Sequence, residues 1–122
     1  MGKFSNVMGT LYSYFNGFLP AYIENQVPEG ATFPYITYSI AFENEFEDNL
    51  IQARIWTKEN STTDLRKYSD LIADDIGYGK IVNCKEGGNL WLKAGSPFMQ
   101  FVSDEDITIK SNYINIITNF LI

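Results

Sequence analysis

The chain has 122 residues, which fits one ordinary hydrophobic core, so residues 1–122 are predicted to form a single domain. Its net charge of −6 argues against a protein that binds nucleic-acid phosphates, because such a protein needs a basic face. The single cysteine, Cys84, excludes an internal disulfide framework and is typical of a reducing cytoplasm, and no run of residues reaches the ~18 apolar positions of a membrane-spanning helix.

Residues 4–19 are predicted to form an amphipathic helix. Apolar side chains recur there at spacings of three and four residues, which places them on one helical face. These side chains are Phe4, Val7, Met8, Leu11, Phe15, Phe18 and Leu19. Because nearly all of them are large, we expect the helix to lie across a flat apolar surface such as a sheet face. Polar residues interrupt the apolar run, so the segment is not expected to be a signal peptide.

Two strands are predicted next, after an irregular connection over residues 21–34. Residues 35–42 and 50–57 are rich in β-forming residues. In each segment one side of the alternation is apolar and the other side is mixed. A polar turn separates the two segments, so we expect them to form an antiparallel hairpin.

A second amphipathic helix is predicted over residues 61–76. Ser61 is a favourable N-cap residue, and the glycines at positions 77 and 79 end the helical pattern. The apolar side of this helix consists of Leu65, Tyr68, Leu71, Ile72 and Ile76.

The rest of the chain is predicted to be mainly strand. Residues 80–84 and 89–94 predict a second hairpin, residues 95–106 are expected to be irregular, and residues 107–121 predict a long strand with a bulge or bend. The elements thus follow the order α-β-β-α-β-β-β. This order predicts an α+β domain, in which two helices pack on one face of an antiparallel sheet of four to five strands.

Most residue types that build catalytic and metal sites are missing. The chain has no His and one Cys, so it cannot form the usual Ser–His or Cys–His nucleophile or a structural zinc site. It contains no glycine loop of a phosphate-binding type. We therefore expect no catalytic residue, no cofactor and no metal, and do not expect an enzyme.

Two acidic clusters remain as candidate sites. The first lies around the predicted turn of the first hairpin and consists of Glu43, Glu45, Glu47 and Asp48. The second, residues 104–106, precedes the last predicted strand. Neither has the ligand rhythm of a calcium loop. Both are typical of solvated turns, and the first is also a candidate for a loop that repels passing DNA.

The aromatic content suggests a protein interface. Eight Tyr and nine Phe exceed what one small core readily shelters, and such residues are enriched where proteins meet. A core rich in Tyr with hydrated hydroxyl groups is the alternative. The segment 95–103 is unusually apolar for a loop, so it is expected either to cover the core or to dock into a neighbouring subunit. The candidate interface residues are Phe98, Met99, Phe101 and Trp91, although each Trp taken alone is more typical of a core.

Three passages give the chain a family resemblance. The chain resembles the tail terminator and tail completion proteins of long-tailed bacteriophages in the passages VPEGATFPYITYSI, ARIWTKENS and NLWLKAGSPFMQFVSDED. The resemblance extends from about Val27 to Leu121. None of these passages is a catalytic signature.

The resemblance implies a structural virion protein at the head-proximal end of the phage tail, made in the host cytoplasm. Subunits of this family form a ring, commonly a hexamer, that caps the tail tube and joins it to the head–tail connector protein. The implied partners are further copies of the chain, the tail tube protein and the connector. DNA passes through such a ring without specific binding, and an acidic lumen lined by the first cluster suits that passage. No membrane is implied.

Two alternatives stay open at the level of sequence. One is another head–tail connector or minor virion protein. The other is a small acidic protein-binding module of the inhibitor or immunity type, which is expected to be a monomer that captures one partner.

Overall fold

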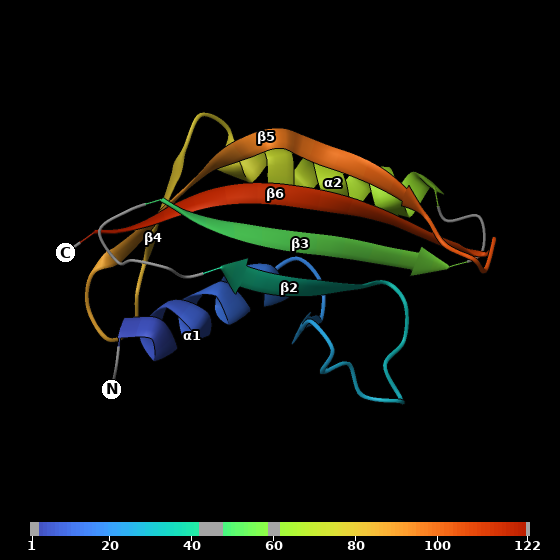
Figure 1. The fold of residues 1–122 in the computed structure, drawn as a ribbon, viewed down its shortest axis with the longest axis horizontal. Coiled ribbons are helices and arrows are strands. Elements are labelled where there is room, and N and C mark those ends of the chain that lie inside the picture. Colours follow the sequence, from blue (N-terminus) through green and yellow to red (C-terminus); the bar gives the residue numbers. More distant parts are fainter. Residues whose placement is uncertain (1–2, 42–47, 59–61, 122) are drawn as a thin grey trace.

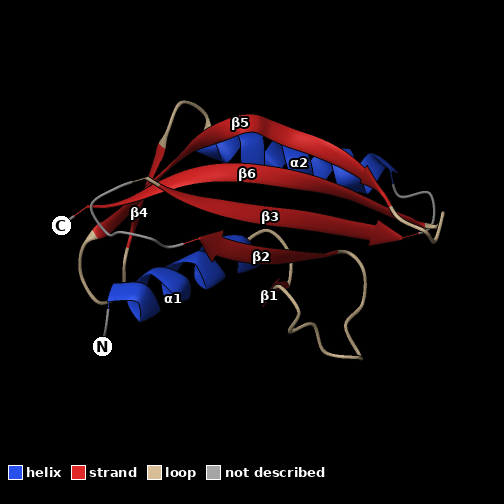
Figure 2. Cartoon of the chain, in the orientation of Figure 1, coloured by secondary structure: helices blue, strands red, loops and turns tan. Residues whose placement is uncertain are grey.

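The computed structural model describes residues 3–41, 48–58 and 62–121, which form two helices and six strands (Figures 1 and 2). In chain order the elements are α1 (Lys3–Asn16), β1 (Ala21–Ile23), β2 (Tyr35–Ala41), β3 (Asn49–Lys58), α2 (Thr62–Ile76), β4 (Lys80–Asn83), β5 (Asn89–Ser103) and β6 (Ile109–Leu121). The predicted N-cap Ser61 lies outside the described residues. The helix predicted to reach residue 19 ends at Asn16, where Gly17 begins a turn.

The six strands form one mixed sheet in the order β1-β2-β3-β6-β5-β4. The prediction of a purely antiparallel sheet of four to five strands is therefore wrong, and the order of elements is α-β-β-β-α-β-β-β. The additional strand is β1, which runs parallel to β2 and pairs Ala21 with Ile36. Three residues are too few to show a strand periodicity. Their pairing depends on a partner strand farther along the chain, which the local sequence does not reveal.

Both helices lie on the same face of the sheet, since residues of both belong to one core cluster with the inward-facing strand residues. In the view of Figure 1, α2 lies behind β5 and β6. Helix α2 packs against β3, β6 and β5. Helix α1 crosses the other part of this face, where its Phe15 ring lies 5.2 Å from the ring of Tyr38 on β2. The side chains that point toward the helices are the alternate positions of each central strand, as the strand pairings require.

The core lies between this face and the helices. Helix α1 contributes three fully buried side chains, and the central strands contribute a row of buried aliphatic residues. The core includes Val7, Leu11, Phe15, Ile36, Tyr38, Ile51, Ala53, Ile55, Leu65, Ile72, Ile76, Ile114 and Ile116. Each fully buried large side chain contributes about 1.5–3 kcal/mol to folding by leaving water.

The sheet curls around α1. This helix contacts β1 at one edge of the sheet and β4 at the other edge. Asn6 fastens the second of these contacts, because its amide nitrogen donates to the Gly87 carbonyl at 2.9 Å and its amide oxygen accepts from the Glu86 N–H at 3.0 Å. The N-terminal helix therefore lies within the curl of the sheet and bridges its two edges.

Strand β5 differs from its prediction. The segment expected to be irregular after residue 94 continues as strand to Ser103 and pairs with β6. The pairing shifts once. Between two successive pairs, Ala94 with Ile116 and Met99 with Ile114, β5 advances by five positions and β6 by only two. The bulge or bend predicted for the last strand, β6, thus occurs in its partner strand, β5. Residues 99–103 form a strand because β6 supplies partners for their backbone N–H and C=O groups, which the local sequence does not indicate.

Candidate interaction surfaces

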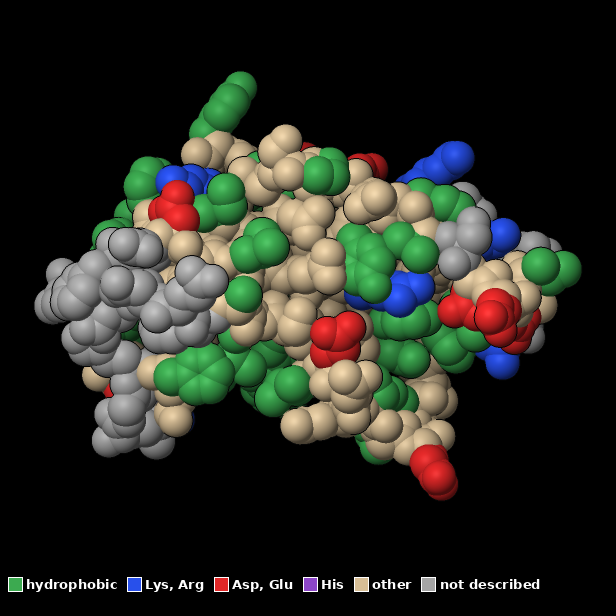
Figure 3. Space-filling model, viewed as in Figure 1, with side chains coloured by type: hydrophobic (Ala, Val, Ile, Leu, Met, Phe, Trp, Pro, Cys, Tyr) green, Lys and Arg blue, Asp and Glu red, His purple; other side chains and the backbone are tan. Residues whose placement is uncertain are grey.

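No helix among the described residues covers the second face of the sheet, which faces the viewer in Figure 3. Hydrophobic side chains lie beside Lys or Arg side chains on this face, between stretches of polar surface. The strand pairings assign the following residues to it: Tyr35, Thr37, Leu50, Gln52, Arg54, Trp56, Trp91, Lys93, Ser111, Tyr113 and Asn115. We call it the open face.

Arg54 is the centre of a flat aromatic arrangement on the open face. Its guanidinium carbon lies 3.7 Å from the ring centroid of Trp56 and 4.8 Å from that of Tyr113. Its Nε donates to the Ser111 hydroxyl at 3.0 Å, and its Nη1 donates to the Tyr113 hydroxyl at 3.2 Å. These contacts hold the guanidinium flat against the sheet, and each cation–π contact at such a site contributes about 0.5–1 kcal/mol.

Further rings extend this arrangement toward β1. Trp56 stacks on Tyr35 at 6.2 Å, and its indole nitrogen donates to the Thr37 hydroxyl at 3.0 Å. Tyr35 in turn contacts Phe33 at 5.1 Å and Tyr22 at 5.8 Å between ring centroids. We call the set Tyr22, Phe33, Tyr35, Arg54, Trp56 and Tyr113 the aromatic platform. Burial raises the pKa of Tyr35, and the nearby charge of Arg54 acts in the opposite direction.

The two tryptophans lie on the open face rather than in the core. Trp91 is 37% exposed, and the Lys93 ammonium lies 4.7 Å from its ring centroid. The expectation that each Trp belongs to the core is therefore wrong, because the strand register turns both away from the helices. Lys93 also lies 3.9 Å from the Asp48 carboxylate, an exposed pair of small energetic value.

Asp48 is the one member of the first acidic cluster that the described residues include. Glu43, Glu45 and Glu47 lie outside them. A lumen-facing role for this cluster stays a prediction.

The candidate interface residues of β5 do not form one patch. Phe98 and Met99 are half-buried and pack against the core. Phe101 is 57% exposed. It pairs with Asn112, whose side chain donates to Ser69 on α2, so Phe101 lies on the helix-bearing side while Trp91 lies on the open face.

The outer edge of β5 is largely unpaired. Strand β4 pairs with β5 from Asn89 to Leu92. Beyond Leu92, no strand in the described part of the chain pairs with this edge, although β5 continues to Ser103. The edge therefore presents free backbone N–H and C=O groups next to the exposed ring of Phe101. The sequence signal was the apolar content of residues 95–103, which predicted either a cover for the core or a docking segment and did not indicate a strand edge.

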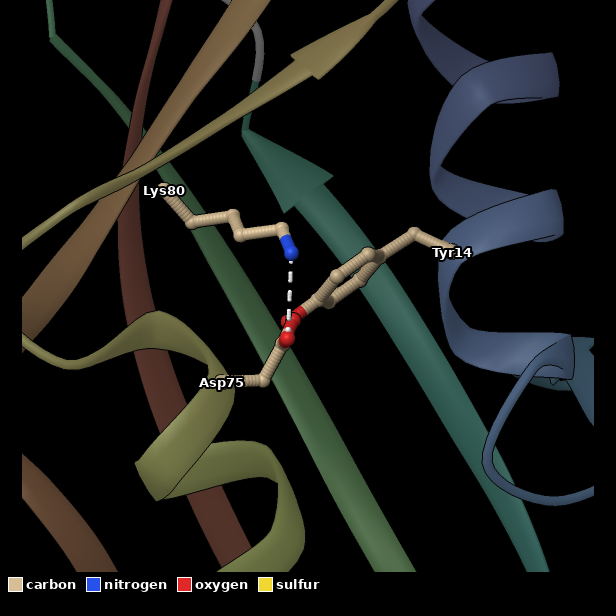
Figure 4. Close-up of polar contacts among 3 residues, drawn as sticks. All are labelled: Tyr14, Asp75 and Lys80. Carbon is tan, nitrogen blue, oxygen red and sulfur yellow. Dashed lines mark hydrogen bonds and ion pairs between the residues drawn. The ribbon is translucent and has the colours of Figure 1, made fainter.

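A groove of about 650 Å³ lies between α1 and β4. Its α1 side consists mainly of small residues, including Ser5, Gly9 and Ser13. Tyr14, which also lines it, donates its hydroxyl to Asp75 of α2 at 2.8 Å, and the Lys80 ammonium of β4 lies 3.0 Å from the same carboxylate (Figure 4). Burial, the hydrogen bond and the negative charge of Asp75 together raise the pKa of Tyr14, so its hydroxyl stays protonated. These three residues tie α1, α2 and β4 together.

The described residues include neither a cluster of metal-ligating side chains nor a membrane-spanning helix. In residues 3–41, 48–58 and 62–121 no group of three or more His, Cys, Asp or Glu side chains could hold a metal ion. No helix in these ranges is long and apolar enough to cross a membrane. The sequence matches no protein-family model, and no curated protein matches it.

Proposed function

We propose that this chain is a ring-forming tail terminator or tail completion subunit of a long-tailed bacteriophage. It caps the tail tube, joins it to the head–tail connector protein and resides at the head-proximal end of the tail. DNA passes through the ring without specific binding. The observation that carries the proposal is the unpaired outer edge of β5 from Lys93 to Ser103.

An unpaired strand edge is a template for another chain. Pro97 and the shifted pairing blunt the edge near residues 95–98, but Met99–Ser103 are regular and pair continuously with β6. The opposite edge of the sheet is the three-residue strand β1. A contact between two different edges is heterologous, and such contacts generate rings when the rotation between subunits closes. Two different edges on one sheet therefore support the proposed ring assembly.

The passages that carry the family resemblance support the same proposal. Each contributes an aromatic residue to the open face: Tyr35, Trp56 and Trp91. These rings are not needed to fill the core, which the aliphatic residues and the helices already close. Exposed aromatic residues on a sheet are typical of a surface that meets another protein.

The test is the variant Phe101→Asp. Its charge falls on an exposed ring position beside the free edge, so the fold should persist while ring formation is lost. The matched control is Tyr78→Asp, because Tyr78 is another exposed aromatic residue but lies in the turn between α2 and β4. Phe98 is unsuitable, since it packs against the core and a charge there would disturb folding.

Assembly is measured by light scattering and electron microscopy, with the protein alone and with polymerised tube protein encoded in the same genome. Wild type and Tyr78→Asp should form rings or cap the tubes, whereas Phe101→Asp should remain a folded monomer by circular dichroism. Rings formed equally well by Phe101→Asp would rule out the β5 edge. A wild-type chain that stays monomeric with tubes and captures a single other protein would favour the alternative, a small protein-binding module.

A further inference from the structure

The guanidinium of Arg54 has no anionic partner within the described residues. Two of its five N–H groups have partners, the hydroxyls of Ser111 and Tyr113, and both partners are neutral. Among the described cations, Lys80 lies 3.0 Å from the Asp75 carboxylate and Lys93 lies 3.9 Å from that of Asp48. Arg54 differs from the other cations in that aromatic rings and two hydrogen bonds fix its guanidinium. The chain has 15 acidic and 9 basic residues, so carboxylates outnumber the cations that they could pair with.

The aromatic platform prepares this guanidinium to bind an oxyanion. The rings of Trp56 and Tyr113 fix its plane, so little side-chain entropy is lost when a carboxylate pairs with it. The neighbouring rings of Tyr35 and Phe33 offer an apolar surface beside the charge. A segment with a carboxylate next to an exposed aliphatic side chain would complement both features.

The chain itself carries such a segment in the turn between β5 and β6. The Asp106 N–H donates to the Asp104 carboxylate at 3.0 Å, and the Thr108 N–H and hydroxyl donate to the Asp106 carboxylate at 2.9 Å and 2.6 Å. The two hydrogen bonds from Thr108 also lower the pKa of Asp106. The turn is therefore ordered before any binding, and it presents the exposed carboxylate of Glu105 two residues from Ile107, which is 83% exposed.

We propose that the aromatic platform binds the β5–β6 turn of a second copy of this chain. Glu105 of the turn pairs with the Arg54 guanidinium, and Ile107 packs on the platform rings. The same copy does not supply the turn: Arg54 is paired with Tyr113, which is five residues from Thr108, or about 17 Å along an extended strand. The inference rests on the proposed self-assembly and names a second contact for it, again between two different surfaces.

A charge exchange between the two surfaces tests the contact. Arg54→Glu and Glu105→Arg should each weaken assembly roughly tenfold, and the double variant should recover it to within about threefold of wild type. Lys85→Glu is the matched control, since it reverses an exposed cation in the turn between β4 and β5, outside both the platform and the free edge of β5, and should leave assembly unchanged. Association is measured by light scattering across a concentration series, with circular dichroism to confirm each fold. No recovery in the double variant, with all variants folded, overturns the pairing.

A second measurement does not require rings to form. A peptide of residues 102–110 is added to the ¹⁵N-labelled Phe101→Asp chain, and the resonances of the Trp56 indole N–H and the Arg54 Nε–H are followed. They should shift with wild-type peptide and at least threefold less with a Glu105→Gln peptide. Absent shifts overturn the inference while leaving the ring proposal to the Phe101 test. Larger shifts with single-stranded DNA than with the peptide would also overturn it, because the ligand would then be phosphate.

Discussion

At the scale of single residues, Tyr14 illustrates how a polar contact can hold separate elements together. Its hydroxyl donates to Asp75 from within a largely apolar setting, and Lys80 balances the carboxylate from the other side (Figure 4). The Lys80–Asp75 pair is partly exposed, so its own contribution to stability is small. The hydrogen bond from Tyr14 to Asp75 is expected to contribute more to stability than the ion pair, because it links α1 to α2.

Tyr14→Phe should lower the free energy of unfolding by about 1 kcal/mol at neutral pH, since it removes one hydrogen bond and leaves the Asp75 carboxylate with Lys80. Urea unfolding followed by circular dichroism measures this change. The control is Tyr12→Phe, because Tyr12 is an exposed ring on the same helix. Equal stability of the two variants would show that the Tyr14 bond contributes nothing.

The same residue predicts alkaline behaviour. The folded-state pKa of Tyr14 lies above its ordinary value of 10.0, so above that pH the unfolded chain releases a proton that the native chain keeps. The stabilisation is complete below about pH 10 and is lost as the pH rises beyond it. Wild type should therefore lose stability above about pH 10 more steeply than Tyr14→Phe. Parallel curves for the two proteins, from urea unfolding at each pH, would contradict this assignment.

At the scale of elements, β5 shows how a strand can accommodate extra residues. Its backbone comes so close to β6 at Gly95 that a Cβ atom there would lie 2.9 Å from the Asn115 carbonyl oxygen. The Asn115 amide nitrogen also donates to the Pro97 carbonyl at 2.8 Å, which fastens the shifted segment to β6. The glycine is thus required by the close approach of two backbones.

Gly95→Ala should destabilise the chain by about 1–3 kcal/mol, because the new methyl group would overlap backbone atoms that cannot move aside cheaply. Gly30→Ala is the matched control: a Cβ there meets no atom within 4 Å, and the change should stay within about 0.5 kcal/mol. Thermal unfolding compares the two. A Gly95→Ala chain as stable as the control would mean that β5 and β6 separate readily at this point.

The predicted elements differ in how far their own residues determine them. The helix over 62–76 and the first hairpin follow from local periodicity and end where turn residues occur. Strand β1 and the second half of β5 do not. Ala21–Ile23 are a strand because β2 lies beside them, and residues 99–103 are a strand because β6 does.

At the scale of the whole molecule, the sheet has one closed face and one open face. Both helices cover the first face, and α1 reaches both edge strands, so the sheet curls around it (Figure 1). Neither helix covers the open face, and β4 covers the outer edge of β5 only from Asn89 to Leu92. In the assembly that we propose, the β5 edge pairs with a strand of one neighbour and the open face binds the acidic turn of a neighbour.

The sequence alone determined the two amphipathic helices, the two hairpins and the lack of a histidine-based or zinc-based site, because each of these depends on residues near one another in the chain or on composition. The alternation in residues 50–57 also placed Arg54 and Trp56 on the side opposite the apolar residues, as the structure confirms. The tertiary structure decided the parallel strand β1, the free edge of β5 and the placement of Trp91 on the open face. These features depend on which distant strands pair and in what register. Leu90, Trp91 and Leu92 are all apolar, so the alternation of their own strand does not show which side faces the helices.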